Sequence, residues 1–234
     1  MRAERKLEQI TKTATRLKKL YTAAVYDIMD EMGLPHQCLD LAIKPIDRAM
    51  RIAGPAFTIA TAADPRSDAE YTDFPEVSTF DFFKRMYPGC VVLVAAAGDR
   101  QAGHWGELMS TAAKARGAAG VVVDGGMRDG NLLFDIPDWP VFTRYMSPIE
   151  SKARARIRAI EKPIAVCGST VSHLRVDSGD WIFGDMDGVV VIPTARVDDV
   201  LKKAEEIGGI EDEIRDQIRN GADVRKVFEK YGRL

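Results

Sequence analysis

The sequence predicts an α/β fold with helical extensions, and three observations support this. Two continuous apolar runs, 90–97 and 120–124, are typical of strands buried on both faces of a sheet. Between them, 106–116 has apolar residues at helical spacing. The two ends of the chain are rich in charged residues, which also recur at helical spacing. Strand, helix and strand in this order form a βαβ unit, whose crossover is expected to be right-handed.

The N-terminal elements are predicted to be helices. Residues 3–20 are amphipathic and predict an arm, 1–20, that lies on the surface or on a neighbouring subunit. Thr22 has the side chain of an N-cap for a second helix over 23–32. Gly33 is expected to end that helix in a left-handed conformation.

A strand over 51–60, with a Gly-Pro kink inside it, follows these helices. The polar stretch 62–82 predicts a long loop, and loops of this length often act as lids. The basic segment 150–161 is consistent with a helix or an irregular excursion. Shorter strands are expected at 141–144, 164–167, 171–176, 180–183 and 189–193. The C-terminal region, 195–234, predicts two or three charged helices with breaks near Gly208 and Gly221.

No linker or internal repeat divides the chain, so 1–234 is expected to be one domain. Of its 234 residues, 46% are hydrophobic and 29% are charged, which is enough to build a core without disulfides. The net charge of −2 argues against a dedicated nucleic-acid binder. The charged N-terminus is not a secretory signal, and no apolar run is long enough to span a bilayer. We therefore expect a cytoplasmic protein with no membrane partner.

The residues that follow the strand 120–124 are the first candidates for chemistry. Three glycines in 125–130 surround Arg128 and Asp129, which indicates unusual backbone or a close approach by a ligand. Ligands bind at the carboxyl edge of open α/β sheets. Asp129 offers oxygen ligands suited to Mg²⁺ or Mn²⁺, and Arg128 offers a rigid fork for a carboxylate or an enolate oxygen. An Arg-Asp pair in an ordinary solvated turn is the alternative.

The helix that begins at Gly106 favours a site here. Its first turn presents free backbone N–H groups and the positive end of the helix dipole, both of which attract anions. Glycine at the start allows an anion to approach the backbone closely. Glu107 lies in the same turn, where complementing the dipole is sufficient to explain it.

The spacing Glu107-x20-Arg128-Asp129 resembles the D-x20-R-D motif of the class II pyruvate aldolases, which include 4-hydroxy-4-methyl-2-oxoglutarate aldolase. These enzymes belong to the RraA-like family, with the regulator of ribonuclease activity A and proteins long mislabelled demethylmenaquinone methyltransferases. The resemblance covers most of 20–220 and includes RIAGPAFTIAT at 51–61 and VDSGDWIFGDMDGVVVIP at 176–193. It is weakest at 62–85 and 144–162.

The resemblance implies roles for particular residues. The amides of the first helical turn, Gly106, Glu107, Leu108 and Met109, are expected to bind the substrate carboxylate. Arg128 is expected to stabilise the enolate oxygen, and Asp129 to ligate the divalent metal. The acidic residue at 107 is expected to contact a metal-bound or catalytic water.

The resemblance also implies a layered β/β/α swivelling fold that assembles as a trimer or as a hexamer made of two trimers. A glutamate from the adjacent subunit is then expected to complete the metal shell. Glu211 is the candidate because it lies eighteen residues past the proline of VVVIP, and Glu205 and Glu206 are the substitutes.

The implied activity is a carbon–carbon lyase that cleaves a 4-hydroxy-2-oxo acid to pyruvate, with oxaloacetate decarboxylation as a second activity. One departure from the motif concerns substrate identity, because Glu107 stands where the aldolases have Asp. The additional methylene moves the carboxylate by about 1.5 Å, enough to change rates strongly. The alternatives are a non-catalytic regulator of ribonuclease and a related lyase that acts on a sugar-acid derivative.

Other side chains near the motif have two explanations each. His104 is either an acid or substrate contact, or an exposed loop histidine. Trp105 either forms a wall of the pocket or packs in the core. Asp99 either faces the pocket or shapes a turn with Gly98.

Overall fold

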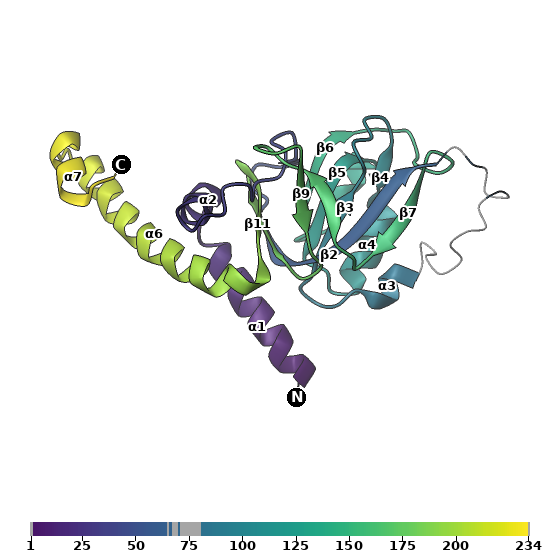
Figure 1. The fold of residues 1–234 in the computed structure, drawn as a ribbon, viewed down its shortest axis with the longest axis horizontal. Helices are drawn as coiled ribbons and strands as arrows, with labels where there is room; N and C mark the ends of the chain where they lie inside the picture. The colour runs from purple at the N-terminus through teal and green to yellow at the C-terminus, as the bar shows by residue number, and fades with distance from the viewer. Residues whose placement is uncertain (1, 65, 67–69, 71–80, 234) are drawn as a thin grey trace.

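The computed structural model describes residues 2–64, 66, 70 and 81–233. Within this part of the chain, nine strands form one mixed sheet and two more form a hairpin in front of it (Figure 1). The strands are β1 (Lys44–Pro45), β2 (Ile52–Ala63), β3 (Val91–Ala95), β4 (Gly103–Trp105), β5 (Gly120–Met127), β6 (Val141–Met146), β7 (Ala155–Ile160), β8 (Ile164–Cys167), β9 (His173–Val176), β10 (Trp181–Asp185) and β11 (Gly188–Ile192). The helices are α1 (Arg2–Leu17), α2 (Thr22–Glu31), α3 (Asp81–Arg85), α4 (Glu107–Ala115), α5 (Gly130–Leu133), α6 (Val197–Arg219) and α7 (Val224–Tyr231), with a 3₁₀ turn at Thr194–Arg196.

Four parallel strands, in the order β6-β5-β3-β2, form the centre of the sheet. β3 and β5 lie in register from Val91 opposite Gly120 to Ala95 opposite Asp124, and α4 lies on the connection between them. Both strands are buried along their full length, as their continuous apolar sequences predict. Antiparallel β10 and β11 extend the sheet beyond β2.

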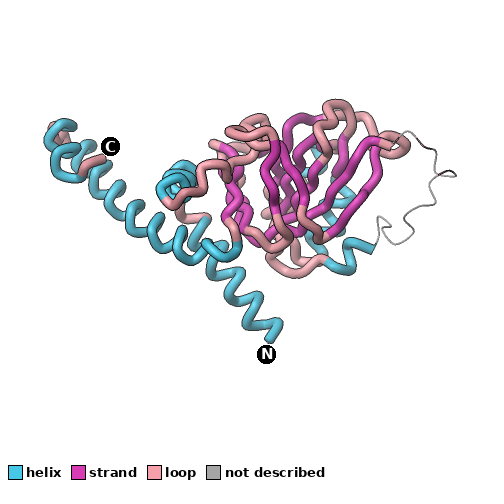
Figure 2. Tube along the Cα trace, viewed as in Figure 1, coloured by secondary structure: helices cyan, strands magenta, loops and turns pink. Residues whose placement is uncertain are grey.

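The two faces of the central strands pack against different layers. Leu93 and Val122 face the β8–β9 hairpin and pack with Val166. Their neighbours along the chain point the other way, where Val123 packs with Ala113 of α4. Hairpin, sheet and helix therefore form three layers, seen in Figure 2 with the helix behind the strands. The predicted β/β/α arrangement is confirmed.

A third apolar cluster joins the terminal helices to the outer strands β10 and β11. α1 and α6 leave the domain in different directions, and α7 lies at the far end of α6 (Figure 1). α2 is fixed to the sheet by Asp185 at the end of β10. This carboxylate accepts hydrogen bonds from the backbone N–H of Thr22 at 2.8 Å and from the Thr22 hydroxyl at 2.7 Å.

Two details of the predicted elements differ from the structure, and the ends of two helices agree with the prediction. Tyr21, not Thr22, precedes the first turn of α2, because the Thr22 hydroxyl is used to bind Asp185. α6 continues through Gly208, where a break was expected. Gly33 and Gly221 both have positive φ and end their helices as predicted.

Residues 155–160 form a strand, β7, where a helix or excursion was expected. Arg156 and Arg158 alternate along it with apolar residues, and this period of two is the strand signal. Both arginines turn toward the buried carboxylate of Asp64 at the end of β2, whose pKa is held well below its usual range, first of all by its hydrogen bond with Arg66. Most of the predicted 62–82 lid lies outside the described residues. In the described part of the chain, no helix combines the length and apolarity needed to cross a membrane.

The Asp185–Thr22 contact gives a prediction for stability. Replacing Asp185→Ala leaves the buried N–H and hydroxyl of Thr22 without an acceptor, which should lower the free energy of unfolding by about 1–3 kcal/mol. Urea denaturation followed by circular dichroism measures the change. Asp187→Ala, at the exposed tip of the same β10–β11 turn, is the control and should cost much less. Equal losses in both variants would show that Asp185 does not hold α2.

Candidate functional site

A cleft of about 240 Å³ opens at the carboxyl edge of the parallel strands. β5 ends there at Met127, which pairs with Met146 at the end of β6 and with Trp105 at the end of β4. The residues that line the cleft are Gly103, His104, Trp105, Gly106, Leu108, Met109, Arg128, Asp129, Glu150 and Ser151. Gly106, Leu108, Met109, Arg128 and Asp129, which were predicted from separate parts of the sequence, are therefore neighbours.

The start of α4 touches the turn after β5. Gly106 precedes the helix in an extended conformation, so its backbone geometry does not require glycine. The available space does require glycine, because a Cβ atom at this position would overlap Oδ2 of Asp129 and lie 3.0 Å from Cγ of Arg128. A glycine at 106 therefore lets the first turn of α4 lie directly against the Arg-Asp pair.

Asp129 lies between the helix and Arg128. Its Oδ2 accepts a hydrogen bond from the backbone N–H of Glu107 at 3.2 Å, and its Oδ1 lies 3.3 Å from Nε of Arg128. Its backbone is in the left-handed region, with φ of 62°. Few residues other than glycine adopt this conformation, and such positions are frequent at binding sites. These contacts place the Asp129 carboxylate between α4 and Arg128.

The side chain of Glu107 is directed away from the interior of the cleft, whereas Leu108 is among the residues that line it. The carboxylate of Glu107 accepts a hydrogen bond from the Thr111 hydroxyl at 2.7 Å, and the side chain lines a neighbouring groove beside Lys114. The Leu108 side chain is 78% exposed. The backbone amides of a first helical turn have no partner within the helix.

The predicted glutamate Glu211 is not brought near Asp129 within one chain. It lies on α6, which extends away from the sheet (Figure 1), and its carboxylate is 3.4 Å from Arg233. Glu205, one of the substitutes, forms a paired contact with Arg16 of α1 at 2.6 and 2.7 Å. Glu206 lines a separate groove on α6. Among residues 2–64, 66, 70 and 81–233, no group of three His, Cys, Asp or Glu side chains is arranged to hold a metal.

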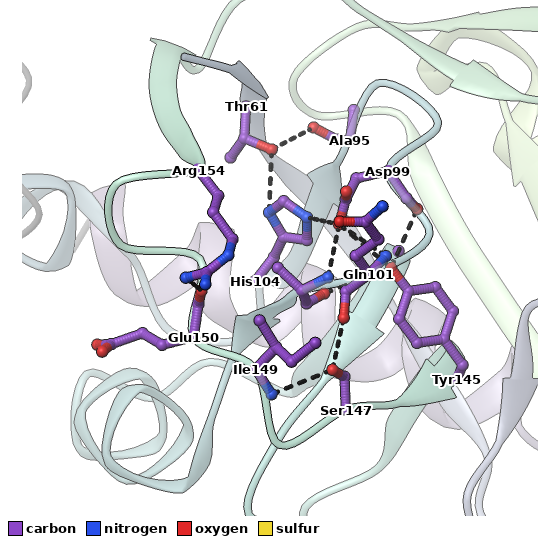
Figure 3. Close-up of polar contacts among 12 residues, drawn as sticks. Thr61, Ala95, Asp99, Gln101, His104, Tyr145, Ser147, Ile149, Glu150 and Arg154 are labelled. Atoms are coloured by element: carbon purple, nitrogen blue, oxygen red, sulfur yellow. Dashed lines mark hydrogen bonds and ion pairs between the residues drawn. The ribbon is translucent and has the colours of Figure 1, made fainter. Parts of the chain in front are cut away.

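A buried polar network supports one wall of the cleft (Figure 3). His104 is 2.9 Å through Nε2 from Oδ2 of Asp99, and its side chain is almost fully buried, so it is not an exposed loop histidine. The Asp99 carboxylate also accepts from the Ala102 amide at 2.9 Å, and the Tyr145 hydroxyl donates to the Asp99 backbone oxygen at 3.1 Å. Burial opposes ionisation of Asp99, but the amide and the histidine together hold its pKa below the usual range.

These contacts distinguish between the two explanations given for Asp99 and for Trp105. Asp99 is not among the residues that line the cleft, and it shapes the turn between β3 and β4. Trp105 packs in the core against Phe82 and donates to Ser110 at 3.0 Å, although the same residue also lines the cleft.

The glycines of the 125–130 segment are explained by the protein itself. Gly125 and Gly126 are part of β5, and side chains there would collide with Ala96 and Tyr145. They allow close approach by the chain's own side chains, where approach by a ligand was one of the expectations. The unusual backbone predicted for the segment occurs at Asp129.

Glu150 and Ser151 line the cleft but were not predicted. They follow the end of β6, which runs parallel to β5 and therefore delivers its next residues to the same edge. Glu150 Oε1 lies 3.7 Å from Nη1 of Arg128. The strand 141–144 was predicted. Had it been placed beside the strand 120–124, the residues after it would have been expected at the cleft. The order of strands in the sheet was the missing information.

Comparisons with known proteins agree with this architecture. A family model described as RraA-like, Aldolase/RraA, matches residues 22–191. A Halalkalibacterium halodurans protein named "Putative 4-hydroxy-4-methyl-2-oxoglutarate aldolase" is 32% identical over 193 residues, which cover 81% of this chain and 80% of that protein. Protein DlpA of Legionella pneumophila is 28% identical over 210 residues, 90% of this chain, but the match spans only 32% of DlpA.

The solved structures show the same fold. Streptomyces coelicolor RraAS2, described as an unusual member of the RNase ES inhibitor RraA protein family, superimposes with a TM-score of 0.75. The match covers 88% of this chain and 98% of that chain at 23% identity. At this identity the likeness concerns the fold alone.

The contact at Gly106 can be tested by adding one methyl group. Gly106→Ala should displace Asp129 and Arg128 and weaken Mn²⁺ binding by about tenfold, as losses of ligand orientation do. Isothermal titration with Mn²⁺ measures the affinity, and circular dichroism checks that the fold is kept. Gly209→Ala, on α6 with nothing within 4 Å of the added carbon, is the control and should bind Mn²⁺ like the parent. Unchanged affinity in Gly106→Ala would contradict the expectation that Asp129 ligates a divalent metal.

Proposed function

The chain belongs to the RraA-like family, and from that premise we propose that it is a divalent-metal-dependent lyase that releases pyruvate from a 4-hydroxy-2-oxo acid. One observation carries the proposal. The first turn of α4, the guanidinium of Arg128 and the carboxylate of Asp129 line a single cleft at the carboxyl edge of the sheet. An anion-binding helix start, a fixed cation and an oxygen ligand are what enolate chemistry on a 2-oxo acid requires.

The donor atoms in the cleft fit a hard divalent cation. Its carboxylates are those of Asp129 and Glu150, and both are partly accessible to solvent. Mg²⁺ and Mn²⁺ favour one or two carboxylates completed by water. We assign Asp129 as the ligand because its two oxygens lie between Arg128 and α4. A divalent ion bound there supplies positive charge that polarises the substrate carbonyl.

The substrate's carboxylate is assigned to the backbone amides at the start of α4. Helix N-termini bind anions through free N–H groups and the helix dipole. In the structure one of these amides, that of Glu107, donates to Asp129, so a substrate carboxylate bound there would compete with that contact. The cleft is large enough for a small 2-oxo acid.

Arg128 is assigned to the oxygen on which negative charge develops. Breaking the bond between C3 and C4 of the substrate leaves an electron pair that forms the enolate of pyruvate. The C4 hydroxyl loses its proton as it becomes the carbonyl of the leaving aldehyde or ketone, and a proton returns to C3. A guanidinium oriented before the reaction stabilises the enolate oxygen without reorganisation. Decarboxylation of oxaloacetate passes through the same enolate and is the proposed second activity.

Glu107 is proposed to act on the proton through a water molecule. Its carboxylate binds Thr111 on the outside of the first turn, so direct contact with the reacting carbons is not the arrangement seen. A glutamate is longer than the aspartate of the motif, and a rotation about its side chain would be needed to face the cleft. Because of this difference at residue 107, the substrate of the present chain is expected to differ from that of the related aldolases.

The site is proposed to be completed by a neighbouring subunit in a trimer or a pair of trimers. Leu108, which lines the cleft, is an exposed apolar side chain, as are Leu132, Phe134, Met146 and Ile149. Apolar patches of this kind are typical of protein interfaces. Glu211 of the adjacent chain remains the candidate for the outer metal shell.

A role as a ribonuclease regulator is not favoured by a specific observation. The structural likeness to an inhibitor of RNase ES is at 23% identity and shows the fold. A protein that acts by binding alone does not require Arg128 and Asp129 in one cleft.

Arg128 provides the first test of the lyase. Arg128→Lys keeps the charge but loses the rigid fork, so kcat for pyruvate release should fall about 10²–10³-fold with Mg²⁺ present. A lactate-dehydrogenase-coupled assay with 4-hydroxy-2-oxo acids and oxaloacetate measures the release. Arg116→Lys, at the exposed end of α4, is the matched control and should keep full activity. If the unmodified protein releases no pyruvate from any of these compounds, the proposal fails.

Subunit sharing has a test of its own. Asp129→Ala and Glu211→Gln should each lose most activity, because each removes one half of every site. Refolding the two variants together should restore about a quarter of the parental activity, because some interfaces then combine an intact Asp129 with an intact Glu211. The recovery is measured as pyruvate released per chain. Full activity in Glu211→Gln alone, or no recovery in the mixture, would exclude Glu211 as the shared residue.

A further inference from the structure

Arg128 and Glu150 follow the neighbouring strands β5 and β6, and β4 holds the backbone of both. The Arg128 amide donates to the backbone oxygen of Trp105 at 3.0 Å. Glu150 forms a bridge with Gly103, whose amide donates to the backbone oxygen of Ile149 at 2.8 Å. A Cβ atom on Gly103 would lie 2.9 Å from Cβ of Arg128, so β4 lies directly against both residues. Their backbones are therefore fixed relative to each other by this short strand.

Further hydrogen bonds hold the segment that carries Glu150 (Figure 3). The Ser147 hydroxyl donates to the backbone oxygen of Gln101 at 2.5 Å and accepts from the amide of Ile149 at 3.2 Å. The Arg154 guanidinium donates to the backbone oxygen of Glu150 at 3.0 Å. Because these contacts are made to the main chain, they fix the point from which the Glu150 side chain extends. Figure 3 shows that side chain running away from the backbone that Arg154 contacts.

The guanidinium of Arg128 contacts two carboxylates through different nitrogens. Its Nε lies 3.3 Å from Oδ1 of Asp129, and its Nη1 lies 3.7 Å from Oε1 of Glu150. Two such contacts restrict the rotation of the planar group as well as its position. Asp129 is also the proposed metal ligand, and a carboxylate that binds a metal cation attracts a second cation less strongly. Glu150 is then the carboxylate that keeps Arg128 oriented.

The exposure of this ion pair separates a catalytic effect from a structural one. The side chains of Arg128 and Glu150 are 34% and 61% exposed, and ion pairs with such exposure contribute little to stability. Orientation at reacting atoms has larger effects, because a displacement of about 1 Å can change a rate about 100-fold. The pair is therefore expected to affect catalysis and not folding.

Resting on the proposed lyase function, we infer that Glu150 is a positioning residue that holds the guanidinium of Arg128 toward the enolate oxygen. In this role Glu150 does not touch the reacting atoms and transfers no proton. Its effect arises as the electron pair of the broken C3–C4 bond becomes the enolate and negative charge develops on oxygen. The role is the same for oxaloacetate, because decarboxylation forms the same enolate.

Turnover separates an effect on kcat from one on substrate binding. With Mg²⁺, Glu150→Gln should lower kcat for pyruvate release about 10–100-fold and change KM less than about threefold, with the urea midpoint of the parent. Glu229→Gln is the matched control, because Glu229 is 67% exposed and lies 3.9 Å from Arg225, and it should keep the parental kcat. Parental kcat in Glu150→Gln, or a loss of kcat matched by a loss of stability, overturns the inference.

A double-mutant cycle tests whether Glu150 acts through Arg128. In an Arg128→Lys background, Glu150→Gln should lower kcat by less than about twofold, because an ammonium group has no planar fork to orient. Residues that act as a unit show this non-additivity. An equal loss in both backgrounds would mean that Glu150 acts on the substrate or on the structure directly, and it would overturn the inference.

Binding of unreactive ligands gives a measurement that does not require turnover. Oxalate resembles the enolate of pyruvate, with negative charge on the oxygen assigned to Arg128, whereas pyruvate has a neutral carbonyl oxygen there. Titration calorimetry with Mn²⁺ should show that Glu150→Gln weakens oxalate binding at least about tenfold relative to pyruvate binding. Removal of one negative charge from the cleft would by itself favour the dianion oxalate, so the sign of the change distinguishes orientation from charge.

The outcomes of this titration separate the inference from the lyase function on which it rests. An unchanged or increased preference for oxalate in Glu150→Gln, or no binding of oxalate by the parent, overturns the inference. If the parent releases no pyruvate but Glu150→Gln shows the expected loss of oxalate binding, the lyase function fails and the orientation of Arg128 by Glu150 is retained.

Discussion

The contact between the start of α4 and the turn after β5 is the constraint on which the candidate site depends. Gly106 has no side chain because Asp129 and Arg128 occupy that space. The helix is held there by the βαβ unit, since it connects two adjacent buried strands, and its N-terminus therefore meets the carboxyl end of β5. The layered fold thus places the start of α4 near the turn after β5. The absence of a side chain at residue 106 allows the two to touch.

Much of this arrangement could be predicted because its signals are local. The continuous valines of β3 and β5, the helical spacing between them and the positive-φ glycines Gly33 and Gly221 depend on neighbouring residues only. The grouping of Arg128 and Asp129 at a sheet edge follows from the end of one strand. These are the parts in which sequence and structure agree.

The differences between prediction and structure arise where residues far apart in the sequence determine the local structure. Thr22 has the chemistry of an N-cap, but Asp185, more than 160 positions away, uses its hydroxyl. The alternating arginines of β7 indicate a strand, yet they are stabilised by Asp64 from another element. Gly208, where a break was expected, lies inside α6. Glu150 could be identified as a cleft residue only from the strand order, because β6 lies beside β5 and brings Glu150 close to Arg128. Glu211 depends on an assembly that one chain does not contain.

The twelve residues of β2 have a consequence for how the chain reaches this fold. Along its length β2 pairs first with β10, then with β3 and finally with β7. Two of these partners lie roughly a hundred or more positions later, and such pairings are slow because a long loop must close first. During synthesis from the N-terminus, one edge of β2 stays open until β7 and β10 have emerged. An open apolar strand edge is a template for association with other chains. The strand that pairs with β3, β7 and β10 in the finished sheet is therefore also a segment open to misassembly while the domain is being made.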